Sequence, residues 1–401
     1  MTVTISASKA AGVVSAPPSK SVAHRSLICG AFSEKSIIKN IEYSADILAT
    51  LSCLHALGAR VEKKETQVEI GGLKINNIPE NAELFCGESG STLRFMIPIC
   101  LLSGKSVTLK GAKRLFERPL SVYEEIFRKY GVSYQKGEDF ITICGKIPPD
   151  EYVVRGDISS QFITGLMFAL SLMSGSSSIA VTGKFESESY IDLTVSVLKD
   201  FGIEIKRSGN KYIISGGGYK SMEYTVEGDY SNAAFLDAFN LLDGEVQVTG
   251  LNANSVQGDK VYKEMFEQLS GGKKDFDLSD CPDLAPVMFA MAAVKGGARF
   301  TGTARLKIKE SDRAEVMREE LKKFGINLKV QENEVIVEKG DITPPTEILC
   351  GHNDHRIVMS LSLLCSMVGG TIEGAEAVNK SFPDFFDKIK ALKVDVILND
   401  N

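Results

Sequence analysis

The stretch Ser19-Lys20-Ser21-Val22-Ala23-His24-Arg25 follows the proline pair Pro17-Pro18 and precedes the apolar run Ser26–Phe32. Because the residue before a proline favours extended backbone, Ser19 is expected to cap a helix that begins at Lys20. The free N–H groups and the dipole at a helix start favour anions, and Lys20, Ser21 and Arg25 would lie there. Alone, this stretch fits a hydrated basic first turn equally well.

Starts of the same kind recur along the chain. Polar or acidic residues followed by an apolar run begin at intervals of 70, 70, 72, 52 and 71 residues, near Ser19, Ser89, Ser159, Ser231, Asp283 and Asp354. In five of the six, the run ends at glycine and passes into a short β-like segment, as in Gly244–Gly250. Most continue with a more amphipathic helix, such as Asp46–Leu57, and with further strand-like pieces. The pattern predicts six copies of one α/β unit, ordered helix, strand, helix, strand, strand.

The six units divide best into two similar domains. A chain of 401 residues is too long for one ordinary core, and the clearest boundary between the third and fourth units is Tyr224–Gly228. The β-like run Met1–Ile5 is too short to be a domain and is expected to pair with the second half. The predicted domains are therefore 19–226, with units one to three, and 1–18 plus 227–401, with units four to six.

Composition restricts the class of protein. A net charge of −6 argues against a general nucleic-acid binder. The 8 cysteines are scattered and form no Cys-x-x-Cys, which suits a reducing cytoplasm. No apolar signal region is evident in Met1–Gly12, and no stretch reaches membrane-spanning length. We expect a cytoplasmic enzyme or binding protein that uses neither membrane nor nucleic acid.

Basic side chains gather at or near glycines, prolines and predicted helix caps. They are Lys20, Arg25, Arg94, Arg118, Lys309, Arg313, Arg356 and Lys380. Arginine forks, lysine charges and exposed N–H groups are what phosphates and carboxylates prefer. Two opposed sets of such helix starts would form an anion-binding cleft.

Each motif alone has a plainer interpretation. The segment Gly87–Arg94 is a weak glycine-rich loop, and Ser159–Gln161 is more often a helix cap than a ligand site. His352 and His355 suit a capped helix start better than a metal, since no third ligand is evident. Lys309–Arg313 could be a solvated face in which Lys309 pairs with Asp312. The recurrence at matching points of six units is what favours a shared function.

In order, the motifs S-K-S-x-x-x-R, G-x-S-G-S-T-x-R, E-R-P, S-S-Q-F, S-x-S-Y-I-D, C-P-D, K-E-S-D-R, N-D-H-R and K-S-F-P-D span Ser19 to Asp384. In this order they resemble the 5-enolpyruvylshikimate-3-phosphate synthase family. The resemblance implies a two-domain inverted α/β barrel with three βαβαββ units in each domain. It also implies transfer of an enolpyruvyl group from phosphoenolpyruvate to the 5-hydroxyl of shikimate 3-phosphate, with release of phosphate, through a tetrahedral intermediate.

The resemblance also implies the site residues. Those expected to bind shikimate 3-phosphate are Lys20, Ser21, Arg25, Ser159, Ser160, Gln161, Ser187, Tyr190, Asp283, Arg305 and Lys309. Those expected to bind phosphoenolpyruvate are Lys20, Gly90, Arg94, Arg118, Gln161, Arg313, Arg356 and Lys380. Asp354 and His355 are expected to lie behind these ligands.

Catalysis is expected from Lys20, Asp283 and Glu310. By resemblance, Asp283 accepts the hydroxyl proton and Glu310 protonates the methylene carbon. Physical chemistry supports two differently tuned carboxylates, since protons move on both sides of the adduct. No metal and no organic cofactor is expected, and the protein is expected to be a monomer.

The chain departs from the family pattern at four positions near the predicted site. Pro18 stands where glycine is frequent, Glu88 where asparagine is usual, Ser91 where threonine is usual, and Arg305 where many members have asparagine. Gly90 leaves the space that glyphosate needs at the phosphoenolpyruvate site. We expect inhibition by glyphosate, and an inhibition constant far above the Michaelis constant for phosphoenolpyruvate would contradict that expectation.

Two other functions remain as alternatives. The sister enzyme, UDP-N-acetylglucosamine enolpyruvyl transferase, has the same architecture, but its mobile loop normally carries a cysteine, and Lys110–Arg118 contains none. A non-catalytic anion-binding scaffold would gain nothing from the carboxylates Asp283 and Glu310. It would also lack aromatic platforms beside most of its basic residues.

Overall fold

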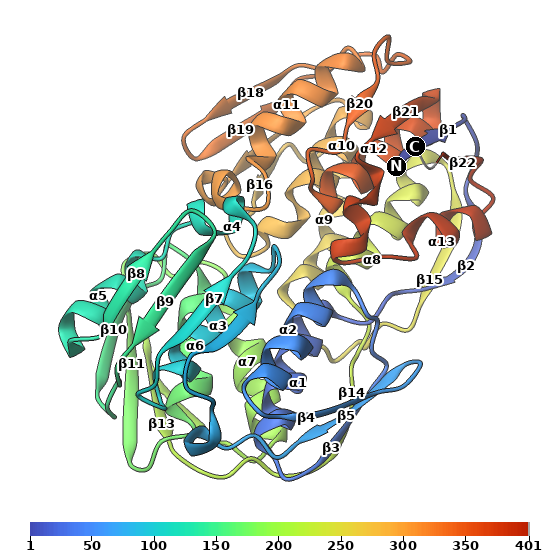
Figure 1. The fold of residues 1–401 in the computed structure, drawn as a ribbon. Coiled ribbons are helices and arrows are strands. Elements are labelled where there is room, and N and C mark those ends of the chain that lie inside the picture. Colours follow the sequence, from blue (N-terminus) through green and yellow to red (C-terminus); the bar gives the residue numbers. More distant parts are fainter. Residues whose placement is uncertain (400–401) are drawn as a thin grey trace. The chain divides into compact units, whose positions relative to one another are not determined.

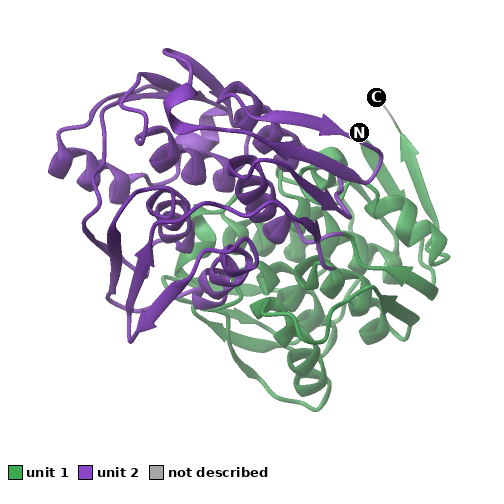
Figure 2. Cartoon of the chain, turned by 90° about the horizontal axis from the view of Figure 1, so that it is seen from below, with its two compact units in different colours: residues 1–17, 228–401 green, residues 18–227 purple. Residues whose placement is uncertain are grey.

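The computed structural model describes residues 1–399, and the chain divides into two compact units, coloured separately in Figure 2. Unit 1 comprises Met1–Pro17 and Gly228–Asn401, and unit 2 comprises Pro18–Glu227. Each unit has its own cluster of buried apolar side chains. The chain thus leaves unit 1 after Pro17, completes unit 2 and returns at Gly228.

Unit 2 contains three repeats of helices and strands within residues 18–227 (Figure 1). The first comprises α1 (Lys20–Phe32), β3 (Ser36–Lys39), α2 (Ala45–Ala56), β4 (Arg60–Lys63), β5 (Gln67–Gly71) and the 3-10 turn η1 (Ile75–Asn77). The second comprises β6 (Ala82–Phe85), α3 (Gly90–Cys100), β7 (Val107–Lys110), α4 (Lys113–Glu117), α5 (Ser121–Tyr130), β8 (Ser133–Lys136) and β9 (Phe140–Cys144). The third comprises β10 (Glu151–Arg155), α6 (Ser160–Leu170), β11 (Ser176–Thr182), α7 (Glu188–Asp200), β12 (Ile205–Ser208) and β13 (Lys211–Ser215).

Each repeat of unit 2 builds a four-stranded sheet of the same design. In the orders β6-β7-β9-β8 and β10-β11-β13-β12, the first two strands are parallel, and a hairpin adds the other two antiparallel. The first repeat has the order β14-β3-β5-β4, in which β14 (Glu223–Thr225) comes from the far end of the unit and runs parallel to β3. The last strand of unit 2 therefore completes its first sheet.

Unit 1 holds the other three repeats within residues 1–17 and 228–399. The fourth comprises α8 (Tyr230–Asp237), η2 (Ala238–Leu242), β15 (Glu245–Thr249), η3 (Gly258–Val261) and α9 (Tyr262–Ser270). The fifth comprises β16 (Asp275–Asp277), η4 (Pro282–Leu284), α10 (Ala285–Val294), β17 (Ala298–Thr301), η5 (Ala304–Ile308), α11 (Arg313–Lys323), β18 (Leu328–Gln331) and β19 (Glu334–Val337). The sixth comprises β20 (Leu349–Cys350), α12 (His355–Val368), β21 (Gly370–Glu373), η6 (Ala375–Lys380), α13 (Phe385–Ala391) and β22 (Val396–Asn399).

The N-terminal strands complete two sheets of unit 1. Strand β1 (Thr2–Ile5) pairs antiparallel with both β21 and β22, in the order β20-β21-β1-β22. The expected pairing of the N-terminal strand with the second half is thereby confirmed. Strand β2 (Ala11–Ser15) runs parallel to β15.

The fourth repeat differs from the expected pattern. Its sheet joins only β15 and β2, and α9 is followed directly by β16 of the next repeat, without the hairpin seen in β16-β17-β19-β18. The missing hairpin accounts for the short interval of 52 residues between Ser231 and Asp283.

The first helix of each repeat is buried on most sides, because most of its own side chains are apolar or small. In α10 nine of the ten residues, Ala285 to Ala293, are buried, whereas α5 and α9 bury one face. Ser19 caps α1, as predicted, by accepting a hydrogen bond from the N–H of Val22, and Ser89, Ser159 and Asp354 cap α3, α6 and α12.

The start predicted near Ser231 is confirmed, because Asp229 caps α8 and the helix begins at Tyr230. The start predicted near Asp283 differs slightly, because Asp283 lies in the turn η4 that precedes α10. None of the helices within residues 1–399 combines the length and hydropathy needed to cross a membrane.

Helices α3 and α6 approach each other at a glycine, which generates the first prediction. A Cβ at Gly165 would lie 2.4 Å from the carbonyl oxygen of Arg94 and 2.5 Å from the Tyr123 hydroxyl. Replacing Gly165 by Ala should lower the free energy of unfolding by about 1–3 kcal/mol, because overpacking against the Arg94 backbone outweighs the helix preference for alanine.

Urea denaturation measures this loss. Gly218→Ala is the control, since a Cβ at Gly218 would meet nothing within 4 Å. A Gly165→Ala protein as stable as the control would contradict the packing argument.

Candidate functional site

In unit 2 the start of α1 holds its basic side chains against neighbouring helices. Lys20 Nζ lies 2.8 Å from Asp46 Oδ2 in the first turn of α2, and Ser21 follows it on α1. Arg25 is 3% exposed and donates to Thr194 Oγ1 at 2.9 Å, to the Ser21 carbonyl at 2.7 Å and to the Tyr190 carbonyl at 3.0 Å. Burial lowers the pKa of Arg25 to about 10, which leaves the guanidinium charged at neutral pH.

A glutamine joins the starts of α3 and α6. Arg94 Nη1 donates to Gln161 Oε1 at 2.7 Å, and Gln161 Nε2 donates to Ser91 Oγ at 3.0 Å. The Arg94 guanidinium also lies 5.1 Å from the centroid of the Phe162 ring, a cation–π distance. The predicted residues Arg94 and Gln161 are thus in direct contact.

Arg118 approaches the first residue of α3 so closely that a Cβ there would displace its guanidinium group. A Cβ at Gly90 would lie 2.5 Å from Arg118 Nη1, and Arg118 is 7% exposed. Gly90 therefore lets a guanidinium lie against the free N–H groups at the helix start, where a bound anion is favoured.

The predicted serines of the third repeat lie at two helix starts. Ser159 caps α6 by accepting from the N–H of Gln161 at 3.3 Å, and Ser160 is the first helical residue. Ser187 precedes α7 in the left-handed conformation, with φ of 56°. The N–H of Tyr190 donates to the Ser187 carbonyl, and its own carbonyl accepts from Arg25. Contacts therefore connect the start of α7 to α1.

In unit 1 the centre of the candidate site is Asp283. Its Oδ1 accepts from Lys309 Nζ at 3.0 Å and from Arg313 Nη1 at 2.9 Å, and its Oδ2 accepts from Arg356 Nη2 at 3.1 Å. Burial alone would raise the pKa of Asp283, but Arg356, Lys309 and Arg313 outweigh it and hold this pKa well below its usual range. Asp283 is therefore ionised.

Arg313 connects three carboxylates. It is 1% exposed, and besides Asp283 it donates through Nε to Asp354 Oδ2 at 2.9 Å and through Nη2 to Glu310 Oε2 at 2.8 Å. Burial opposes the charge, but Asp354, Glu310 and Asp283 raise the pKa of Arg313 above its usual value. The predicted acid Glu310 and base Asp283 thus share one guanidinium.

Asp354 and His355 lie behind this cluster. Asp354 is fully buried, caps α12 by accepting from the N–H of Arg356 at 3.0 Å, and accepts from Ser311 Oγ at 3.1 Å. His355 is buried, with Nδ1 3.9 Å from Asp354 Oδ1. His352 lies apart and bonds Glu320 Oε1 through Nε2 at 2.9 Å.

Arg305 and Lys380, two further predicted residues of unit 1, donate to backbone carbonyls. Arg305 Nη2 donates to the Ser279 carbonyl at 2.5 Å, and Lys380 Nζ to the Asn353 carbonyl at 2.5 Å. Lys309 bonds Asp283, so it is not part of a solvated face. Burial and the nearby charge of Arg313 lower the pKa of Lys309, although the charge of Asp283 raises it. The alternative of a Lys309–Asp312 pair is wrong, because Asp312 instead caps α11.

Sequence reasoning missed the partners of the basic side chains. Asp46 pairs with Lys20, and Thr194 accepts from Arg25. The sequence does offer a signal for Asp46 as a partner of a basic residue, because Asp46 begins a predicted helix, where a carboxylate is favoured. No sequence signal marks Thr194, which is one polar residue among others on α7.

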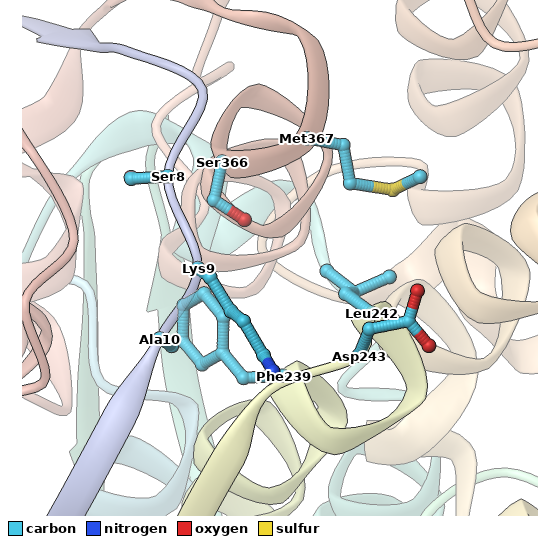
Figure 3. A pocket seen from close by; sticks show the side chains of 8 residues that line it. All are labelled: Ser8, Lys9, Ala10, Phe239, Leu242, Asp243, Ser366 and Met367. Carbon is cyan, nitrogen blue, oxygen red and sulfur yellow. The ribbon is translucent and has the colours of Figure 1, made fainter.

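A pocket of unit 1 lies apart from these clusters. Within residues 1–399, no three His, Cys, Asp or Glu side chains gather as a metal ion would require. A pocket of about 360 Å³ in unit 1 lies at the other end of α12, beside Ser366 and Met367 (Figure 3). Its Lys9 pairs with Glu245 at 2.9 Å, and Asp243 also lines it. The pocket is therefore not part of the cluster around Asp354 and Arg356.

The depressed pKa of Asp283 predicts a specific acid sensitivity. A carboxylate whose pKa is lower in the folded than in the unfolded protein stabilises the fold above the unfolded pKa, and this stabilisation is lost as pH falls through the folded pKa. Asp283→Asn should therefore be less stable than wild type at pH 7, and the difference should narrow as pH falls below about 4.

Urea unfolding at pH 7, 4 and 3 measures this difference. The control is Asp341→Asn, which removes a carboxylate at an exposed position. A pH-independent difference for Asp283→Asn would show that the cations do not hold this carboxylate ionised.

Comparisons with known proteins agree over nearly the whole chain. A family model described as EPSP synthase (3-phosphoshikimate 1-carboxyvinyltransferase) matches residues 5–389. A 3-phosphoshikimate 1-carboxyvinyltransferase of Clostridium botulinum (strain Alaska E43 / Type E3) is 40% identical over 414 residues, covering 96% of this chain and 95% of the relative. One of Clostridioides difficile (strain 630) is 38% identical over 418 residues, covering 96% of each.

Solved structures show the same fold. EPSP synthase from Acinetobacter baumannii matches with a TM-score of 0.78 and 25% identity, covering 99% of this chain and 100% of that one. The enolpyruvyl transferase NikO from Streptomyces tendae matches with a TM-score of 0.75 and 13% identity over 99% of this chain and 98% of that one, which shows the fold alone. With its two α/β units and the matches along its length, this chain belongs to the EPSP synthase (3-phosphoshikimate 1-carboxyvinyltransferase) family.

Proposed function

We propose that this chain transfers the enolpyruvyl group of phosphoenolpyruvate to the 5-hydroxyl of shikimate 3-phosphate and releases phosphate. Membership of the family supports the reaction. The observation that carries it is the contact of Asp283 with Lys309, Arg313 and Arg356. This contact provides an ionised carboxylate among cations, as a reaction between two anions with a proton transfer requires.

Both substrates are anions, so binding them requires many cations. We assign shikimate 3-phosphate to the starts of α1, α6 and α7, where Ser159 and Ser160 cap and begin a helix. The proposed ligands in unit 2 are Lys20, Ser21, Arg25, Ser159, Ser160, Gln161, Ser187 and Tyr190. From unit 1 we assign Asp283, Arg305 and Lys309 to the same substrate.

We assign phosphoenolpyruvate to the guanidinium groups of both units. In unit 2, Arg118 lies against the glycine that begins α3, and Arg94 orients Gln161. The proposed ligands are Lys20, Gly90, Arg94, Arg118, Gln161, Arg313, Arg356 and Lys380. Asp354 holds Arg313 and caps the helix that carries Arg356, and His355 packs beside it.

Protons move in both stages of the reaction. In the addition, the 5-oxygen bonds to the enol carbon, Asp283 accepts the hydroxyl proton and Glu310 protonates the methylene carbon. In the elimination, Glu310 takes a proton back from the new methyl group, the carbon–oxygen bond to phosphate breaks, and the proton on Asp283 passes to the leaving phosphate. Lys20 and the arginines stabilise the leaving phosphate. Every step uses side chains of this chain and no cofactor.

The contacts of Asp283 suggest how its basicity is adjusted. Without substrate, three cations hold its pKa well below the usual range, which would make it a weak base. Substrate anions that bind Arg313, Arg356 and Lys309 offset those charges, so the pKa of Asp283 rises when both substrates are present. The carboxylate would become an effective base only in the loaded enzyme.

We further propose that the protein acts in the cytoplasm as a monomer. Eight free thiols, most of them buried, are typical of a reducing compartment.

One assay tests the proposed function against its alternatives. Phosphate release from phosphoenolpyruvate should require shikimate 3-phosphate and should not occur with UDP-N-acetylglucosamine. Release with the nucleotide sugar would favour the sister enzyme, and no release with either would favour the anion-binding scaffold.

Asp283→Asn tests the proposed base. The variant keeps its size and loses its negative charge, so kcat should fall by about 10²–10⁴-fold, the range for general base catalysis, while both KM values change little. Steady-state kinetics measures both constants. The matched control is Asp341→Asn, and a kcat near wild type for Asp283→Asn would reject the role.

A further inference from the structure

Four buried polar side chains connect α1, α2 and α3 in unit 2. His24 Nδ1 lies 2.8 Å from Thr50 Oγ1, Thr50 Oγ1 lies 2.7 Å from Thr92 Oγ1, and Thr92 Oγ1 donates to Ser89 Oγ at 2.8 Å. All four residues are at most 1% exposed. The chain of hydrogen bonds ends at the N-cap of α3, one residue before Gly90.

The hydrogen bonds can run in only one direction. Since Thr92 donates its hydroxyl proton to Ser89, its oxygen must accept from Thr50. The Thr50 proton is then used, so the Thr50 oxygen must accept from His24. His24 therefore carries its proton on Nδ1, which leaves Nε2 bare.

The surroundings of Nε2 agree with this assignment. Nε2 is buried and makes no hydrogen bond with any residue from 1 to 399, so a proton there would have no acceptor. The ring meets Phe95 edge-on, with centroids 6.4 Å apart. Burial, together with the charges of Lys20 and Arg25, lowers the pKa of His24 well below its usual value. The imidazole thus stays neutral.

Two pairs of side chains, one turn apart, connect α1 to α2. Lys20 and His24 are four residues apart on α1, and their partners Asp46 and Thr50 are four residues apart on α2. Side chains at this spacing share one helix face. The Lys20–Asp46 ion pair lies at the helix start, and the His24–Thr50 bond lies one turn further in.

We propose that His24 is a positioning residue that, through Thr50, Thr92 and Ser89, holds the first turn of α1 in register with the first turn of α3. This inference rests on the proposed function, in which α1 carries ligands for shikimate 3-phosphate and α3 carries ligands for phosphoenolpyruvate. Neutral His24 acts as a fixed donor at Nδ1, and it does not touch either substrate.

Substitutions at Thr50 test the connection without touching a proposed ligand. Thr50→Val keeps the shape and removes the hydroxyl group, which separates His24 from Thr92. Thr50→Ser keeps the hydroxyl group and should restore function. The matched control is Thr108→Val, because Thr108 also makes a hydroxyl pair with another threonine, Thr142, at 2.9 Å, on strands β7 and β9.

Steady-state kinetics with both substrates, at a temperature where each variant is fully folded, provides the readout. For Thr50→Val we expect kcat/KM for phosphoenolpyruvate, at saturating shikimate 3-phosphate, to fall by about tenfold to a hundredfold. Binding of shikimate 3-phosphate alone should change little. Thr50→Ser and Thr108→Val should stay close to wild type. An active wild type with an unaffected Thr50→Val rejects the inference, whereas an inactive wild type rejects the proposed function.

A second measurement does not depend on activity. Nitrogen-15 NMR of the His24 imidazole in the full-length wild-type protein should show a proton on Nδ1, none on Nε2, and no titration between pH 6 and 8. A proton on Nε2, or a His24 that titrates in this range, would overturn the inference even if Thr50→Val failed to fold.

Discussion

The buried charge of Arg313 is the constraint on which the arrangement of unit 1 depends. A guanidinium that is 1% exposed is tolerable only with anionic partners, and Asp283, Glu310 and Asp354 provide them. Each partner comes from a different place, since η4 carries Asp283, the segment before α11 carries Glu310 and the cap of α12 carries Asp354. The ion pairs that Arg313 requires therefore hold three separate backbone segments in place.

Unit 2 solves the same problem with neutral acceptors. Arg25 bonds a threonine hydroxyl and two carbonyls, and Arg94 bonds the Gln161 amide and the Pro119 carbonyl. These acceptors carry no formal charge, whereas Arg313 in unit 1 bonds three carboxylates. Lys20 of unit 2, by contrast, pairs with the carboxylate of Asp46.

The sequence was sufficient to predict elements whose causes are local. Ser19, Ser89 and Ser159 predict helix starts because capping depends on one side chain and the next three N–H groups. The sequence did not predict which residues far apart in the chain would contact each other. Thr194, for example, is 169 residues from Arg25, and nothing local marks it as an acceptor. Likewise, the interval of 52 residues differs from the others, but the sequence did not predict that the fourth repeat lacks its hairpin. The candidate site residues were therefore predictable by motif, and their contacts were not.

The central position of β1 between β21 and β22 has a consequence for synthesis on the ribosome. Unit 2 is one continuous segment, so it can complete its core while the rest of the chain is still being made. The first strand to emerge must instead wait for the last, because its two neighbours are residues 370–373 and 396–399. Thr2–Ile5 lacks both sheet neighbours until residues 370–399 have been made, and Ala11–Ser15 lacks its partner until Glu245–Thr249 have been made. The nascent chain thus exposes two unpaired strands for most of its synthesis, which is the interval when chaperones would be needed most.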